Sequence, residues 1–354
     1  MTLIRSIFWN SEQRRPRTLW RVISQLVLLL VVLLVLQIGL GMVAVSAVLA
    51  GLELNIDQIA DPQAIQQLMV EAPVLVTALQ LSLTVSITLS VWLSGRLLDR
   101  RPFADFGFGL SRDWWVDLAF GLFQGAVLML VIFVIQLAAG WVTVTDTFST
   151  REPGAVFALA ILPPLVTFLA VGFHEELFSR GYQLQNLAEG LNWSFIGPRG
   201  AIAIATVLTS AFFGLLHAAN PHATLVSTLY LSLAGIYLAT GYLLTGELAI
   251  PIGLHITWNF FQGNVFGFPV SGTDFSTATF IRVEQAGPDM WTGGAFGPEA
   301  GLLGLGAMVL GILLTVVWVR WRQGEVALHR PLAEAPVPSQ EAPEARRSDT
   351  IPGR

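Results

Sequence analysis

The sequence predicts an all-α membrane protein with about eight transmembrane helices and a polar cavity among the later helices. Composition is the first reason, because 54% of the 354 residues are hydrophobic and only 12% are charged. In an ordinary soluble domain about a quarter of the residues are charged. The second reason is that long apolar segments recur along the chain, and about 20 such residues are needed for one helical crossing of a bilayer.

Eight segments meet this requirement, at about 23–50, 73–95, 115–142, 155–176, 200–219, 223–245, 248–266 and 300–321. They divide the chain into a cytoplasmic N-terminal segment (1–21), N-terminal transmembrane helices (22–150), a core (151–266), an outer loop (267–299), a last transmembrane helix (300–322) and a tail (323–354). The tail is rich in Ala, Pro, Glu and Arg, a composition that is typical of disorder.

Arginine is distributed unevenly between these segments. Residues 51–72 contain no basic residue and 267–299 contain only Arg282, whereas the segments after the second and eighth helices hold clusters: Arg96, Arg100, Arg101 and Arg112, then Arg320, Arg322 and Arg330. Short cytoplasmic loops carry an excess of positive charge. We therefore expect a multi-pass protein of the cell membrane, with both termini in the cytoplasm and the 51–72 and 267–299 loops outside.

Composition also excludes several kinds of chemistry. The chain contains no cysteine, which rules out disulfides, thiolate nucleophiles and cysteine-ligated zinc. All 19 basic residues are arginine, which rules out Schiff-base and Ser/Lys catalysis. No basic face with interleaved aromatic residues suggests a nucleic-acid partner.

Ionisable residues interrupt one of the later apolar segments. The stretch from Val171 to Tyr182 contains Glu175, Glu176 and Arg180. Such groups cost several kcal/mol in a membrane unless they face the protein interior or a wet cavity, so they indicate a functional site. On a helix Glu176 and Arg180 stand at i,i+4 and can pair, while Glu175 points about 100° away. We expect Glu176 to be held and Glu175 to be free for chemistry.

Two histidines also lie in apolar segments, each with a neighbour one helical turn away. Phe213 shares a helix face with His217, and His255 shares one with Asn259. A single buried histidine is usually structural. Several polar groups on neighbouring helices need partners inside the bundle, however, and the simplest partners are one another.

Such a set of side chains can support hydrolysis. Glu175 can take a proton from water while His217 orients that water, and His255 and Asn259 can donate hydrogen bonds to a developing oxyanion. The HExxH zinc signature is absent, because Phe178 stands where its second histidine would be. A zinc ion held by Glu175, His217 and His255 nevertheless stays an open alternative.

In order along the chain, Glu175–Arg180, Phe213–His217 and His255–Asn259 resemble the motifs EExxxR, FxxxH and HxxxN of a family of intramembrane proteases. This is the CAAX prenyl protease 2 and bacteriocin-processing family, also called the Abi family. The resemblance covers about residues 160–265. It implies endopeptidase activity near the membrane but does not identify the substrate. We predict an intramembrane endopeptidase that acts on a membrane-associated or prenylated-like substrate.

The resemblance also implies roles for individual residues. Glu175 and His217 would activate water, and His255 and Asn259 would stabilise the oxyanion. Glu176, Arg180 and Phe213 would support them. Family members have been described both as metalloproteases and as metal-independent proteases, so the resemblance leaves a zinc cofactor open.

Two other classes of function stay open. A proton-coupled transporter also uses intramembrane Glu, His and Arg, but it requires a polar pathway on both sides of the site. The first three apolar segments offer few ionisable groups for such a pathway. A catalytically idle scaffold would keep the polar cluster for helix packing alone.

The predicted depths of Glu175 and His217 conflict if all segments are straight. Glu175 falls at the cytoplasmic end of segment 155–176, whereas His217 falls roughly 26 Å beyond the cytoplasmic start of segment 200–219, at ~1.5 Å per residue. We expect one of two solutions. Either the fifth helix begins well outside the bilayer, from about Arg199, or the Asn220–Pro221 turn lies at membrane depth inside the protein.

Overall fold

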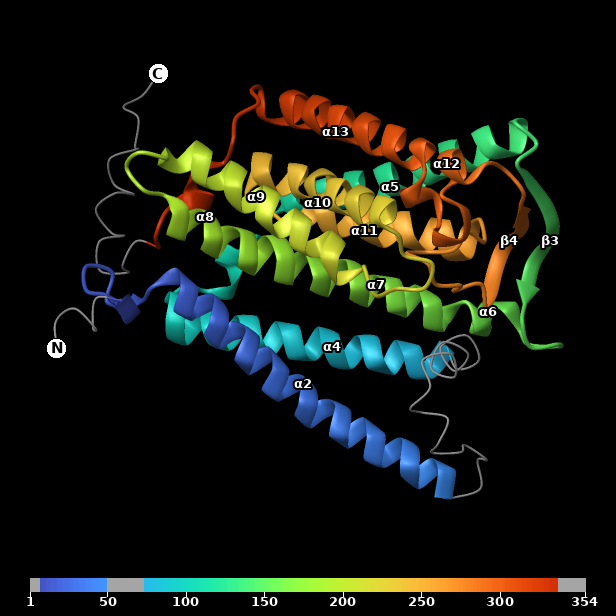
Figure 1. Cartoon of the computed structure of the whole chain (residues 1–354), viewed down its shortest axis with the longest axis horizontal. Coiled ribbons are helices and arrows are strands. Elements are labelled where there is room, and N and C mark those ends of the chain that lie inside the picture. Colours follow the sequence, from blue (N-terminus) through green and yellow to red (C-terminus); the bar gives the residue numbers. More distant parts are fainter. Residues whose placement is uncertain (1–6, 50–72, 337–354) are drawn as a thin grey trace.

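The computed structural model describes residues 7–49 and 73–336, and these form a bundle of long helices (Figure 1). Within this part of the chain seven helical runs are long and apolar enough to cross a membrane. Six of them contain α2 (Thr18–Leu49), α4 (Pro73–Ser94), α5 (Arg112–Ala138), α9 (Gly197–Leu216), α10 (Leu225–Thr245) and α13 (Leu302–Gln323). The predicted all-α, multi-pass membrane protein is thereby confirmed.

The seventh run is longer than the sequence predicted. It joins α6 (Phe157–Ala160), α7 (Leu162–Glu176), a π-helical stretch η4 (Leu177–Leu184) and α8 (Gln185–Leu191) into 35 residues. The predicted end near Glu176 is wrong because the polar residues beyond it, such as Arg180 and Gln183, are buried inside the bundle and continue the helix. Glu175 therefore lies near the middle of this run.

This extension removes the conflict between the two predicted depths. α9 begins at Gly197, shortly after α8 ends. At ~1.5 Å per residue, Glu175 lies roughly 24 Å from the end of α8 and His217 roughly 30 Å from the start of α9. The two helices extend together past the predicted segment ends, so Glu175 and His217 stand at similar distances from the connection between α8 and α9.

The predicted segment 248–266 corresponds to α11 (Ala249–Phe260) and a π-helical turn η5 (Phe261–Val265). α11 is short, but it is the central helix of the bundle and packs against α5, α7 and α10. It crosses α5 so closely that a Cβ atom at Gly253 would overlap the carbonyl oxygen of Leu118, and one at Gly121 would overlap that of Ile250. Small residues permit such close helix crossings.

The first long helix has a different environment. α2 packs on α4 and α8 and diverges from the rest of the bundle along its length (Figure 1). Only 6% of the residues in its apolar window are buried inside the bundle. In a membrane protein such a surface faces lipid, so α2 borders the bundle rather than forming its core.

The predicted outer loop contains regular structure. Its strand β4 (Ala278–Gln285) pairs in antiparallel fashion with β3 (Val142–Thr150), in a register that joins Val142 to Gln285 and Thr150 to Ala278. The short helices α12 (Asp289–Thr292), η6 (Gly294–Phe296) and η7 (Pro298–Ala300) follow. The sequence did not predict this sheet, because its two strands are far apart in the chain. Two further short strands, β1 (Trp9–Asn10) and β2 (Arg15–Pro16), pair near the N-terminus.

The predicted tail also begins later than expected. Residues Arg330–Ala333 form a short helix, η8, that packs on α8 and α9. Leu332 and Ala333 are buried, and Asn192 donates a hydrogen bond to the carbonyl of Ala333. The expectation of disorder therefore does not hold for residues 324–336. The rest of the predicted tail and the 51–72 loop lie outside the described residues.

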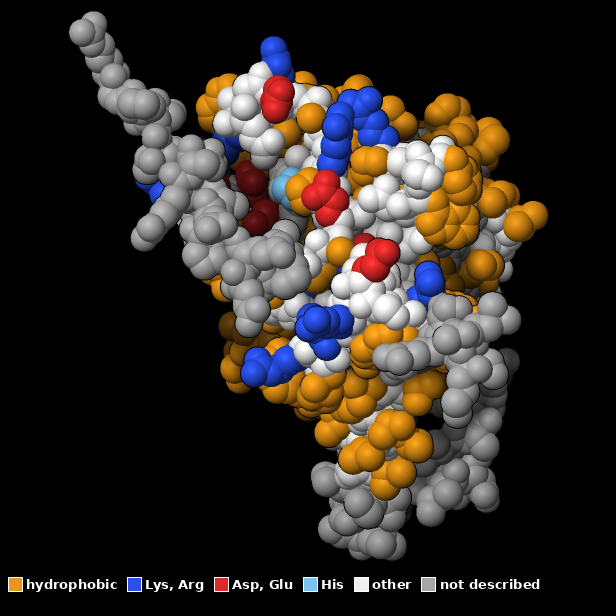
Figure 2. All heavy atoms as spheres, turned by 90° about the vertical axis from the view of Figure 1, so that its left-hand side faces the viewer, with side chains coloured by type: hydrophobic (Ala, Val, Ile, Leu, Met, Phe, Trp, Pro, Cys, Tyr) orange, Lys and Arg blue, Asp and Glu red, His pale blue; other side chains and the backbone are white. Residues whose placement is uncertain are grey.

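A cluster of buried charges ties the ends of several elements together near α8. Glu189 accepts hydrogen bonds from Arg15, Arg21 and Arg101, and Arg21 also binds Asp99 at 2.8 Å. We call these five residues the Glu189 cluster. Charged side chains also gather on the surface of this end of the molecule, whereas apolar side chains surround them (Figure 2). The apolar flanks and charged end are the pattern expected of a protein embedded in lipid.

Candidate active site

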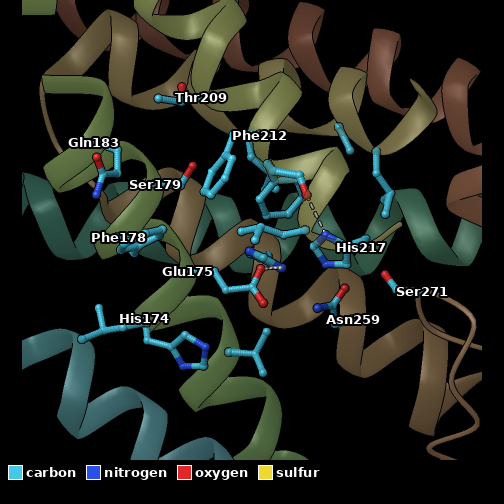
Figure 3. Close-up of a pocket in the computed structure, with 18 of the residues that line it drawn as sticks. His174, Glu175, Phe178, Ser179, Gln183, Thr209, Phe212, His217, Asn259 and Ser271 are labelled. Carbon is cyan, nitrogen blue, oxygen red and sulfur yellow. Dashed lines mark hydrogen bonds and ion pairs between the residues drawn. The ribbon is translucent and has the colours of Figure 1, made fainter. Parts of the chain in front are cut away.

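A cavity of about 710 Å³ lies among α7, α9, α11 and the segment that follows η5. Glu175, His217, His255 and Asn259 all line it. Figure 3 shows the side chains of Glu175, His217 and Asn259 directed into the same space from three different helices. The structure thus brings together the groups that the sequence singled out.

Glu176 and Arg180 form the predicted i,i+4 pair, with 2.9 Å between Arg180 Nη1 and Glu176 Oε1. Both side chains are buried. Arg180 also donates to the carbonyl of Gly235 on α10 and stacks over the ring of Phe213 on α9, 4.8 Å from its centroid. The pair therefore connects three helices around the cavity rather than facing it.

His255 is oriented by Glu176. Its Nδ1 lies 2.8 Å from Glu176 Oε1. An ionised carboxylate that already binds an arginine can only accept a hydrogen bond, so Nδ1 carries a proton and donates it. Nε2 is thereby left for the cavity and lies 3.9 Å from Glu175 Oε2.

Glu175 is the carboxylate that reaches the cavity. Its side chain is 28% exposed, whereas that of Glu176 is 0% exposed. Its Oε2 atom has no hydrogen-bond partner among the residues that the structure describes. An acceptor oxygen that is buried and unpartnered at the edge of a cavity is available to bind water.

His217 lies directly after the last residue of α9, where it caps the helix. Its Nδ1 is 2.8 Å from the carbonyl oxygen of Phe213. Because a carbonyl can only accept, Nδ1 carries the proton and the neutral ring keeps a lone pair on Nε2. This tautomer can accept a proton from water.

The zinc alternative required Glu175, His217 and His255 as ligands. Both histidines donate from Nδ1 to an oxygen, an arrangement that is common among histidines that bind metals. Within the described residues, however, no group of three or more His, Asp or Glu side chains is placed so that it could hold a metal ion. The residues present do not fit a three-ligand zinc site, and the mechanism below uses none.

Comparison with known families gives this geometry its context. Residues 157–261 match the family model described as type II CAAX prenyl endopeptidase Rce1-like. The match covers 105 of the 354 residues and agrees with the resemblance of the three motifs. Rce1-like proteins are CAAX prenyl endopeptidases, and the match supports a membrane protease of this general type. Comparisons with curated proteins and with solved structures found no match.

The Rce1-like match contains every residue of the three motifs, but it ends before other residues that line the cavity. Ser271 and Glu299 lie beyond the match and line the cavity, together with Asn220, which lies within the match in the turn after α9. None of the three was predicted as a site residue from the sequence. The available signal was Glu299, a carboxylate placed directly before the last apolar segment.

His174 also lines the cavity and was considered only as part of a zinc signature. Its Nδ1 lies 2.9 Å from the hydroxyl of Thr84 on α4. This contact connects the catalytic stretch of α7 to α4.

Proposed function

We propose that the protein is an intramembrane endopeptidase that hydrolyses a peptide bond at the Glu175 cavity. The observation that best supports this proposal is the combination of an unpartnered Glu175 oxygen and a His217 lone pair on one cavity. Both groups are proton acceptors that line one cavity, and the proposed water molecule binds between them. The proposed catalytic core is residues 151–266.

In the proposed reaction, water gives a proton to Glu175 as its oxygen attacks the carbonyl carbon of the scissile bond, and His217 orients the water. The electron pair of the C=O double bond moves to oxygen and forms an oxyanion. Asn259 donates a hydrogen bond to this oxyanion, as does Nε2–H of His255 when its ring is protonated. The electron pair of the oxyanion then re-forms the C=O double bond as the C–N bond breaks, and Glu175 transfers its proton to the leaving amine.

Glu176 and Arg180 have a supporting role in this scheme. Arg180 pairs with Glu176, and the same Glu176 oxygen accepts the Nδ1–H bond of His255. A buried carboxylate in this position fixes the ring orientation and stabilises an imidazolium when it forms. His255 can then present Nε2–H to the oxyanion.

The surroundings of the cavity suit a membrane-associated or prenylated-like substrate in the bilayer. One wall consists of apolar side chains from α2 and α9, with Leu26 and Leu29 on one helix and Leu208, Phe212 and Leu216 on the other. Lipid-like chains bind to such surfaces through burial of apolar area. We further propose the cell membrane as the location, with both termini cytoplasmic, because the arginine clusters favour that side.

The decisive experiment uses purified full-length protein in detergent and in liposomes with a quenched fluorescent peptide that carries a lipid group. Cleavage should be lost in Glu175→Ala and in His217→Ala, while helical content and thermal stability stay unchanged. Proton flux into liposomes without any cleavage would instead favour the transporter. If the wild-type protein shows neither cleavage nor proton flux, the scaffold is favoured.

A further inference from the structure

The segment between η5 and α13 contributes a second buried carboxylate to the cavity. Glu299, in η7, is 3% exposed and lines the cavity together with Ser271. It lies outside the residues that match the protease family. No role in the proposed hydrolysis uses it.

Glu299 is held by donors from two other parts of the chain. The backbone N–H of Ser271 donates to Glu299 Oε1, and the Ser271 hydroxyl lies 3.3 Å from the same atom. Gln262, in η5, donates from Nε2 to Oε2. Burial raises the pKa of Glu299 to about 7. The carboxyl group thus joins η5, the 269–273 loop and the start of α13.

The loop bound by Glu299 lies against the turn that carries His217. Asn220 donates from Nδ2 to the carbonyl oxygen of Ser271 at 2.9 Å, and the Asn220 N–H donates to the carbonyl of His217 at 3.1 Å. The next loop residue, Gly272, has φ +82°, and a Cβ atom there would overlap the carbonyl oxygen of Pro221. The loop therefore contacts the 217–221 turn at both Asn220 and Pro221.

The backbone of Ser271 shows that this loop is held in an unusual conformation. Its φ is +48°, in the left-handed region that residues other than glycine rarely adopt. Such a conformation persists only where the surrounding contacts determine it. The contacts of Ser271 with Glu299 and Asn220 hold its backbone in this conformation.

We propose that Glu299 is a positioning residue for catalysis, which fixes the 217–221 turn through Ser271 and Asn220 and so sets the position of His217 against Glu175. The inference rests on the proposed role of His217. His217 follows the last residue of α9, so the helix fixes it from one side only. The contacts of the 269–273 loop hold the turn that follows His217 from the other side.

The test compares kcat and KM of full-length variants with a lipidated fluorescent peptide. Glu299→Ala should lower kcat by about 10- to 100-fold, because misplacement of a catalytic group by ~1 Å can cost that much, with KM changed less than about twofold. Glu299→Gln should restore most of the rate, since its amide oxygen can still accept from Ser271 N–H.

Asn220→Ala tests the same connection from its other end. It should lower kcat by a similar factor. The double variant with Glu299→Ala should be no slower than either single variant, because both substitutions break the same chain of contacts to His217. Asn220→Ala also keeps the test available if Glu299→Ala does not fold.

Gln124→Ala is the matched control. Gln124 is buried and joins α5 to α13 through hydrogen bonds to Gly311 and Thr315, away from the cavity. Its loss should lower thermal stability and leave kcat within about twofold. If Glu299→Ala changes kcat no more than this control does, or if the Glu299 and Asn220 effects add, the positioning role is rejected. Undiminished cleavage by His217→Ala would instead reject the proposed function itself.

Discussion

Two groups of buried charges in this protein, the Glu189 cluster and the Glu175 cavity, use their carboxylates differently. Both oxygens of Glu189 accept from arginines, and the side chain is 6% exposed. Glu175 is 28% exposed and keeps an oxygen without a partner among the described residues. A carboxylate whose hydrogen bonds are all made within the protein has a structural role, and one that retains free acceptor capacity beside a cavity is available for chemistry.

The largest effect is expected from Glu175→Gln. It should lower kcat by at least about 1,000-fold, because the amide cannot take a proton from water. The melting temperature should stay within about 2 °C of wild type, because Oε2 gives up no hydrogen bond. Peptide cleavage and thermal unfolding of the same preparation measure both quantities. A large loss of stability would place Glu175 with Glu189 as a structural residue.

Glu189→Gln should give the opposite pattern. Loss of one partner from a buried ion cluster costs about 3–5 kcal/mol, because Arg15, Arg21 and Arg101 lose their shared counter-ion. The free energy of unfolding in detergent should fall by that amount. The kcat of the fraction that remains folded should be close to wild type, and a specific loss of kcat would contradict the structural assignment.

Glu176→Gln lies between these two cases, because Glu176 binds both Arg180 and His255. We expect kcat to fall by about 100-fold, since His255 loses the anion that stabilises its protonated ring. The unfolding free energy should fall as well, because Arg180 keeps its charge in a buried position without a carboxylate. If stability falls but kcat does not, His255 has no part in oxyanion stabilisation.

The pH dependence of stability should report Glu299. Its pKa rises from 4.5 in the unfolded chain to about 7 in the folded protein, so the folded state favours the protonated acid. Its contribution to the free energy of unfolding is fully present below pH ~4.5. It is lost as the pH rises to about 7, and the free energy of unfolding then falls by about 3 kcal/mol. Unfolding measured between pH 4 and pH 8 should show this fall in wild type. Gln at position 299 cannot titrate. If the stability of Glu299→Gln falls with pH as steeply as that of wild type, another group causes the fall.

The smallest effect is expected from Arg151→Ala. Arg151 and Asp274 form an ion pair at 3.0 Å, with side chains 32% and 52% exposed. Exposed pairs contribute little because water and salt screen them, so the loss should be below about 0.5 kcal/mol. A larger loss would show that exposure is a poor guide to the strength of the ion pairs in this protein.

Sequence reasoning located the catalytic candidates because each had a local signature. The i,i+4 spacing predicted the contact between Glu176 and Arg180, and the apolar surroundings of His255 predicted its burial. The length of the α7–α8 run could not be predicted in this way, because Arg180 and Gln183 are polar residues whose partners lie on other helices. Composition alone therefore placed the helix end too early.

Long-range pairing limited the rest of the prediction. β3 and β4 have no turn between them that would indicate a hairpin, and the strands meet only because the helices bring their ends together. The same holds for Ser271 and Glu299, whose contact depends on the loops after η5 and before α13. Spacing in the sequence carries no information about such contacts.

The close crossing of α5 and α11 limits how the enzyme can open for substrate. With Gly121 and Gly253 in direct backbone contact across the two helices, α11 has no free space in which to slide or rotate toward α5. His255 and Asn259 are therefore carried on a stationary part of the protein. We expect any opening motion during turnover to occur in α2, whose apolar surface is the least enclosed of the long helices.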